Sequence, residues 1–230
     1  MAQRDYILRM FEEMSRAIAQ IVYQREMKDY HASHELIDQQ FRQTLGMGSG
    51  FIQALSDETL LALLTTLGVL NTEKCWLVAL LLKAEGDLHA DEHDESKSYY
   101  SYLKACNLFL EALYNQNHKR EIEKIVEIEA LLNKLEEYEL PLRTKQLLFW
   151  YFEFTNRYGK AEDLLFAILE EETDEAMETT EGIESMDEMR IKGRAFYARL
   201  LSKNDSALES GDFSRTEVKD GLARLQQLSV

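Results

Sequence analysis

The chain has 230 residues, of which 45% are hydrophobic and 10% aromatic, so it is long enough and apolar enough to bury a sizeable core. Its formal net charge of −16 argues against nucleic acid or an anionic membrane surface as a partner, because both would repel it. The opening of the chain carries an acid, Asp5, and leads into an amphipathic helix, unlike a signal peptide. Its longest apolar run, Cys75 to Leu82, is far below the roughly 20 residues that span a bilayer. We therefore expect a cytoplasmic globular protein.

Helix is expected along the whole chain, because Leu, Ala, Glu, Lys and Gln dominate long stretches and Pro141 is the only proline. No run of Val, Ile and Thr alternates with polar residues as a strand would. These signals predict an all-α protein of about 9–11 helices in one domain over residues 1–230.

The first helix is predicted from one apolar stripe, formed by Ile7, Phe11, Met14, Ile18 and Ile21. After a break at residues 26–30, a second helix turns Ala32, Leu36, Ile37 and Phe41 inward. The glycine-rich stretch Gly46–Gly50 ends it. No Lys-Ser/Thr follows these glycines to meet a phosphate, so we interpret the stretch as a flexible linker.

In the middle of the chain, Ser56 followed by two acids predicts an N-cap and a short helix to about Leu67. Asn71 is expected to cap the next helix, Thr72–Asp91, which is apolar on most sides and so should be central. A helix over Lys97–Gln116 would pair with it by turning near Asp94. Cys75 and Cys106 would then lie roughly 10 Å apart, beyond the ~7 Å Cα limit for a disulfide, and are expected to be buried thiols.

A narrow stripe of apolar residues predicts the next helix, from Ile122 to Leu135. Pro141 suits the start of the helix after it, because proline is tolerated in the first turn. That helix carries more aromatic residues than one face can hold. They are either packed into the core or form a surface for a partner, and they are Phe149, Trp150, Tyr151, Phe152 and Phe154.

The last third of the chain is predicted to contain a helix around Ala161–Ile168, a second around Ile191–Leu201, and a final helix opened by the capping box Ser214-x-x-Glu217. Glu170–Met189 holds ten acids and no Lys or Arg. We interpret that stretch as a solvated helix end or loop, because charge runs are usually exposed.

One short pattern returns between these helices: a polar break with an aromatic, then a small residue three positions later. It occurs as Lys28-Asp29-Tyr30 before Ser33, as Arg157-Tyr158 before Ala161, and as Gly211-Asp212-Phe213 before Thr216, with a weaker version from His93 to Ser98. We interpret it as the turn of an antiparallel helix pair.

The chain resembles a degenerate tetratricopeptide-repeat protein, built of helix pairs of 34 residues. The resemblance is carried by the large, glycine, small, aromatic and alanine positions of that motif, filled by Leu82, Gly86, Ser98, Tyr102 and Ala105. It implies a right-handed superhelix of antiparallel hairpins, although the turn pattern recurs at about 55 to 65 residues, which requires an inserted helix.

A second resemblance is to a bacterial family of uncharacterised helical proteins. It rests on the opening, Arg4-Asp5-Tyr6-Ile7-Leu8-Arg9-Met10, and on the end from Ser210 to Leu222, and it spans most of the chain. It implies no activity.

Histidines provide the candidate chemistry. His89 and His93 are four residues apart with carboxylates nearby, a spacing that can hold a metal, and His31 and His34 are three apart. The full HExxH signature is absent and the residues lie at a polar helix end, so we expect no metal, no cofactor and no catalytic residue.

Two functions remain. The first is a non-enzymatic scaffold that binds a protein or peptide, or pairs with a second copy of itself. The alternative is a metal-binding sensor or enzyme that uses the His89–Asp94 region.

Overall fold

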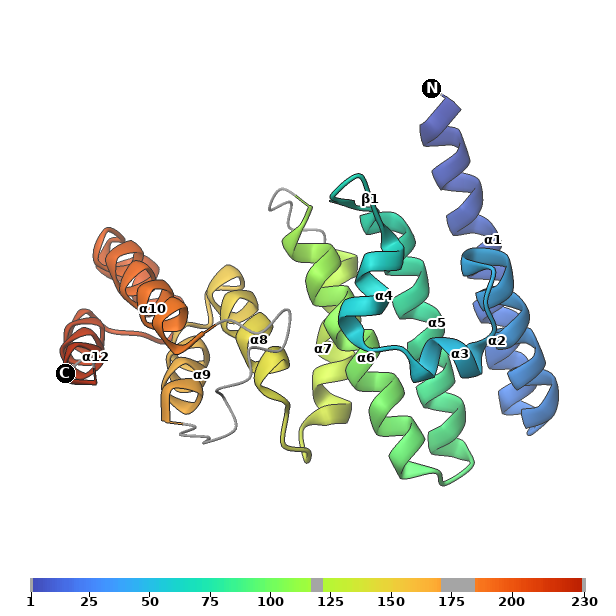
Figure 1. Ribbon diagram of the computed structural model, residues 1–230. Helices are drawn as coiled ribbons and strands as arrows, with labels where there is room; N and C mark the ends of the chain where they lie inside the picture. The colour runs from blue at the N-terminus through green and yellow to red at the C-terminus, as the bar shows by residue number, and fades with distance from the viewer. Residues whose placement is uncertain (1, 117–121, 171–184, 229–230) are drawn as a thin grey trace. The chain divides into compact units, whose positions relative to one another are not determined.

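The computed structural model describes residues 2–116, 122–170 and 185–228, and this part of the chain forms twelve helices and one two-stranded hairpin (Figure 1). The prediction of an all-α protein is confirmed. The helix number exceeds the expected range because it includes two short helices, α3 (Ser49–Ala54) and α11 (Asp205–Glu209), of six and five residues. None of the described helices combines the length and apolar composition needed to cross a bilayer.

The chain divides into two compact units, Met1–Glu139 and Leu140–Val230. One domain over residues 1–230 stays a prediction.

The first unit is organised around α5, which packs along α6 and also contacts α1, α2 and α4. Its elements are α1 (Ala2–Glu26), α2 (Tyr30–Leu45), α3 (Ser49–Ala54), α4 (Asp57–Leu64), β1 (Thr65–Thr66), β2 (Val69–Leu70), α5 (Thr72–Asp91), α6 (Glu95–Tyr114) and α7 (Ile122–Leu135). The central place of α5 follows from its composition, because a helix that is apolar on most sides must be covered on most sides. The two predicted N-caps are confirmed: the side chains of Ser56 and Asn71 accept hydrogen bonds from the backbone N–H groups of Thr59 and Lys74.

The helix expected to run from Asp57 to about Leu67 ends at Leu64, and a hairpin of two-residue strands follows it. Leu67 and Gly68 both have positive φ, 52° and 77°, which is the backbone of a two-residue hairpin turn. The strands are too short to produce an alternating pattern, so sequence reasoning missed them.

The glycine-rich stretch is not the flexible linker that we expected. Gly46 adopts the left-handed conformation (φ 76°) and its N–H bonds to Arg42 O, which closes α2. Ser49 opens α3 by donating its N–H to Asp38 Oδ1 at 2.9 Å, and its hydroxyl donates to the buried carboxylate of Glu85.

The other end of α3 is held by a buried lysine on α6. Lys104 is 8% exposed, and its ammonium group donates to the carbonyl oxygens of Ile52, Gln53 and Leu55 at 3.2, 3.0 and 2.6 Å. Its ammonium group thus binds the carbonyl oxygens at the end of α3, of which Ile52 O also accepts the Leu55 N–H at 3.3 Å. Burial lowers the pKa of Lys104, partly opposed by the negative charges of Asp57 and Glu85.

The two cysteines are free and buried, as expected. Cys75 lies on α5 and its thiol donates to Leu108 O at 3.3 Å. Burial raises the pKa of both thiols, that of Cys106 to about 12. Both groups therefore stay protonated and unreactive near neutral pH.

The second unit contains α8 (Leu142–Phe154), α9 (Tyr158–Glu170), α10 (Met186–Leu201), α11 (Asp205–Glu209) and α12 (Arg215–Gln227). Pro141 is the residue just before α8 rather than its first residue. The predicted capping box of Ser214 and Glu217 is confirmed. Most of the acidic stretch, residues 171–184, lies outside the described residues, but Met189 at its end is buried in the core of this unit.

The recurrent turn pattern has a common geometry, the Schellman motif. In each of the four turns a non-glycine residue adopts positive φ: Lys28, His93, Asn156 and Asp212, between 52° and 62°. The N–H of the following residue bonds to the carbonyl oxygen five positions back, at 2.8 to 3.1 Å, in the pairs Asp29–Gln24, Asp94–His89, Arg157–Phe152 and Phe213–Leu208. The break in each helix is thus a specific C-terminal cap.

Left-handed backbone is strained at a residue with a Cβ, such as Lys28, and glycine would remove that strain. We expect Lys28→Gly to raise the free energy of unfolding by about 0.5 kcal/mol, since the relief of strain exceeds the entropy that glycine adds to the unfolded chain. Urea denaturation measures the change. Lys28→Ala is the control, and an equal gain from alanine would contradict the strain argument.

The two helices that the turn at His93 connects, α5 and α6, approach each other closely near that turn. Gly86 lies against the ring of Tyr102, so that a Cβ placed on Gly86 would be 2.5 Å from the ring. Ser98 Oγ donates to Gly86 O at 3.0 Å. The hydroxyl of Tyr102 donates to Asp87 Oδ1 at 2.7 Å.

Candidate functional site

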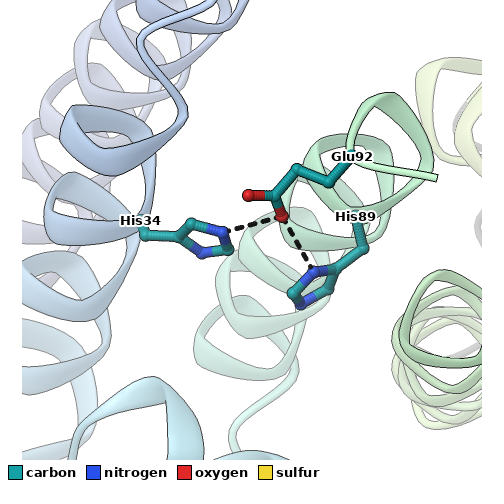
Figure 2. Close-up of side chains that lie close together, drawn as sticks. All are labelled: His34, His89 and Glu92. Atoms are coloured by element: carbon teal, nitrogen blue, oxygen red, sulfur yellow. Dashed lines mark hydrogen bonds and ion pairs between the residues drawn. The ribbon is translucent and has the colours of Figure 1, made fainter. Parts of the chain in front are cut away.

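Three side chains that could ligate a metal meet where α2 faces the end of α5: His34, His89 and Glu92 (Figure 2). His34 lies early in α2, whose start is fixed by Asp29 as N-cap. His89 is in the last turn of α5, and Glu92 is the residue that caps that helix. The turn positions both, because Asp94 N–H bonds to His89 O and Glu92 N–H bonds to Leu88 O.

The three groups converge on one carboxylate oxygen. Glu92 Oε2 is 2.9 Å from His34 Nε2 and 3.4 Å from His89 Nδ1, and the ligand atoms of the three residues all lie within 4.8 Å of one another. The two imidazole rings are 5.3 Å apart between centroids. Figure 2 shows both rings turned toward the carboxylate.

Burial differs across the cluster. His89 is 8% exposed, and its Nδ1 is buried without a hydrogen bond among the described residues. His34 and Glu92 are partly open to solvent, and His34 borders a surface hollow of about 500 Å³. The buried nitrogen thus contacts the Glu92 oxygen at 3.4 Å without the geometry of a hydrogen bond, and it faces two groups that solvent can reach.

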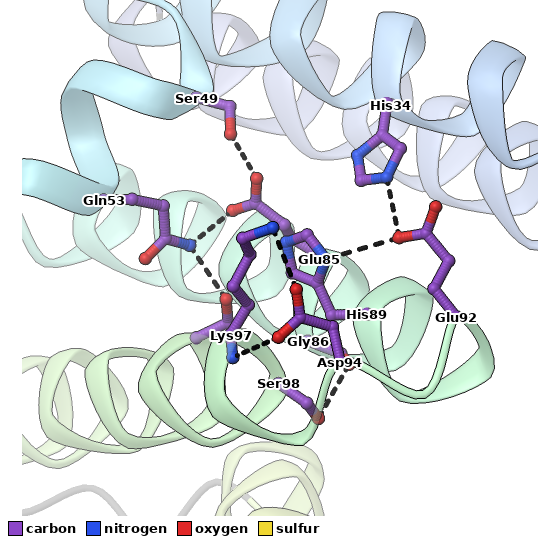
Figure 3. Close-up of polar contacts among 11 residues, drawn as sticks. His34, Ser49, Gln53, Glu85, Gly86, His89, Glu92, Asp94, Lys97 and Ser98 are labelled. Atoms are coloured by element: carbon purple, nitrogen blue, oxygen red, sulfur yellow. Dashed lines mark hydrogen bonds and ion pairs between the residues drawn. The ribbon is translucent and has the colours of Figure 1, made fainter.

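Polar contacts hold the surroundings of His89 in place (Figure 3). One turn earlier, Glu85 accepts hydrogen bonds from Ser49 and Gln53 of α3, and Gln53 also donates to Ser101. On the other side, the Lys97 ammonium beside Asp94 holds the pKa of that carboxyl below its usual range.

Only part of the predicted histidine arrangement is present. His93 is not in the cluster: it is the exposed residue with φ 62° that ends α5. A helical spacing of four from His89 therefore does not hold, because the helix stops between them. His31 is exposed and lies 3.8 Å from Glu35. The expected His89–Asp94 region thus contributes His89 and Glu92 to the cluster. Sequence reasoning missed that His34, 58 positions before Glu92, is their partner.

The aromatic residues of α8 do not behave as one group. Phe149 belongs to the core of the second unit and packs on Phe196, so of the two alternatives core packing holds for this residue. Tyr151 is also buried. Trp150 stacks on Phe154 with ring centroids 5.1 Å apart, and both are partly buried, like Phe152. A partner surface on those three residues stays a prediction.

The first unit also has an open apolar groove of about 680 Å³ bordered by α1, α5 and α7. Trp76 and Leu80 of α5 lie between the apolar side chains of α1 and the charged side chains of α7. The residues that line the groove are Phe11, Met14, Ser15, Ile18, Ala19, Glu73, Trp76, Leu80, Gln116, Lys124 and Glu127.

These observations define an all-α protein of capped helix pairs with a groove and a histidine–carboxylate cluster in its first unit. The chain belongs to a family of unknown function, DUF6483, whose sequence pattern matches residues 1–230. No curated protein and no solved structure matches the chain.

Proposed function

We propose that this protein is a non-enzymatic interaction scaffold of the bacterial cytoplasm, built of tetratricopeptide-like helix pairs. The observation that carries the proposal is the apolar groove over Trp76. We assign to it one occupant, an amphipathic helix of a partner protein with basic residues beside its apolar stripe. A second copy of this chain is the competing occupant.

The packing of α5 on α6 supports the tetratricopeptide-like part of the proposal. In such a helix pair the glycine and aromatic positions matter because the helices approach closely there, and Gly86 does lie against the Tyr102 ring. The residue at the small position, Ser98, lies close enough to bond to the backbone of Gly86. These contacts are the ones expected at the corresponding repeat positions.

The dimensions of the groove suit a short helical segment. Its wall on α1 runs from Phe11 to Ala19, which is about 12 Å of helix axis at 1.5 Å per residue. An apolar groove of this kind holds a helix through side chains at positions i, i+3, i+4 and i+7.

Charge favours a basic partner. Glu73 and Glu127 border the groove. Glu127 is already paired with Lys83 at 2.5 Å, so the attraction comes from Glu73 and from the net charge of −16 on the chain as a whole. The cation of the groove is already engaged, because Lys124 lies 5.3 Å from the centre of the Trp76 ring and bonds to Gln116. A basic helix would therefore gain electrostatic attraction on approach.

The proposal is tested with Ala19→Arg, which adds bulk and positive charge at an exposed residue of the groove wall. We expect capture of the partner from native cytoplasm to fall, and the affinity of the purified partner to fall at least about tenfold, or about 1.4 kcal/mol. Affinity is read from the fluorescence of Trp76 in a Trp150→Phe background.

The matched control is Gln20→Arg, the same charge change on the next residue of α1, which is exposed and does not line the groove. It should keep wild-type affinity. Capture that is equal for both variants would reject the groove. Retrieval of the chain itself, with concentration-dependent mass in light scattering, would reject the foreign helix in favour of a homodimer.

A further inference from the structure

We infer that His34, His89 and Glu92 bind one divalent transition-metal ion of the zinc class, a site that goes beyond the proposed scaffold function. The donor set is two imidazole nitrogens and one carboxylate oxygen, which suits zinc and its neighbours and not calcium or magnesium. Three protein ligands leave one position of a tetrahedral ion for water or a further ligand.

The spacing of the donors fits such an ion. Nitrogen and oxygen ligands about 2.1 Å from zinc are separated by roughly 3.4 Å along the edge of a tetrahedron. The distances from Glu92 Oε2 to the two histidine nitrogens are 2.9 and 3.4 Å. Small rotations of His34 and Glu92, which are both partly exposed, would complete the geometry without a backbone change.

The buried nitrogen of His89 is the second observation that points to a ligand. Buried polar atoms in folded proteins are nearly always paired. His89 Nδ1 has no hydrogen bond among the described residues, yet it points toward the Glu92 oxygen (Figure 2). A metal ion between the three residues would satisfy it.

The ion would also connect two helix pairs. His34 belongs to α2, whereas His89 and Glu92 belong to the end of α5, and these helices already pack against each other. Because the ion binds the folded arrangement and not the unfolded chain, it should stabilise the packing of α2 on α5. An ion can reach the cluster from solvent because the side chains of His34 and Glu92 are themselves partly exposed.

The test is calorimetric titration of the chelator-treated, tag-free full chain with Zn²⁺. We expect one ion per chain, and a rise of the unfolding midpoint of at least about 3 °C at saturating Zn²⁺. His34→Ala and His89→Ala should each weaken binding at least about a hundredfold, more than the 10- to 100-fold typical of an outer-shell partner.

Two controls use the histidines that helical spacing alone would choose. His31→Ala removes the exposed histidine one turn before His34, and His93→Gly removes the exposed one after His89 while keeping the left-handed turn favourable. Both should bind Zn²⁺ like the wild type.

Glu92→Gln guards against a variant that simply fails to fold, because it keeps the size and hydrogen bonding of a partly exposed side chain. It should weaken Zn²⁺ binding at least about tenfold while its circular dichroism and metal-free unfolding midpoint stay near those of the wild type. Absence of stoichiometric binding overturns the proposal. So does binding that survives His34→Ala and His89→Ala, or binding that is lost with His31→Ala or His93→Gly.

Discussion

Replacing Gly86 with alanine is expected to lower the free energy of unfolding of the first unit by about 2 kcal/mol. The added Cβ would lie 2.5 Å from the Tyr102 ring, so the ring or the helix must move. Movement of the ring stretches its hydrogen bond to Asp87, which is 2.7 Å long. The better helix propensity of alanine returns only about 1 kcal/mol.

Denaturant unfolding followed by Trp76 fluorescence in a Trp150→Phe background reports on the first unit. The control is Gly50→Ala, also a helical glycine of this unit, where an added Cβ meets nothing within 4 Å. That variant should be neutral or slightly stabilising. Equal effects from the two substitutions would show that the contact with Tyr102 does not limit the α5–α6 approach.

Replacing Asp87 with asparagine is expected to cost about 2 kcal/mol at pH 7. This carboxylate joins four helices. It accepts from Tyr102 of α6 and pairs with Arg25 of α1 at 3.0 Å and with Lys134 of α7 at 2.9 Å. Asparagine keeps the shape of the side chain but removes the charge that both cations need. Asp91→Asn is the control, since Asp91 pairs with the same arginine but is half exposed, and it should cost well under 1 kcal/mol.

The effect of Asp87→Asn should depend on pH. Burial by itself would raise the pKa of Asp87, but bonds from Lys134, Tyr102 and Arg25 outweigh it, and the net shift is downward. A carboxyl with a lowered folded pKa contributes stability that is present above its unfolded pKa of about 3.9 and is lost as pH falls through the folded value. The difference between wild type and variant should thus be constant from pH 7 to pH 5 and shrink below pH 4. An unchanged difference at pH 3 would mean that charge is not the cause.

Local signals in the sequence were sufficient for the long helices and for the beginnings of three of them. Ser56, Asn71 and Ser214 cap helices where predicted, because an N-cap depends on a side chain and a backbone N–H three residues later. The turn pattern was also recognised, and its backbone geometry explains why it recurs. The apolar composition of α5 on most of its sides identified it as central.

Short elements stabilised by distant residues were not recognised. The stretch expected to be a flexible linker contains the start of α3, a helix too short to form alone. It is held by Glu85 and Lys104 from α5 and α6, far along the chain. Such contacts leave no periodic signal in the stretch itself.

In the histidine cluster, too, the sequence predicted what depends on neighbouring residues and missed what depends on distant ones. The sequence shows His89 and Glu92 near one helix end, since that depends on residues that are close in the chain. Whether His93 joins them depends on the residue at which the helix stops, and its φ of 62° places it outside. The approach of His34, 58 positions before Glu92, is decided only by the packing of α2 on α5, because contacts between distant segments depend on how whole helix faces pack together.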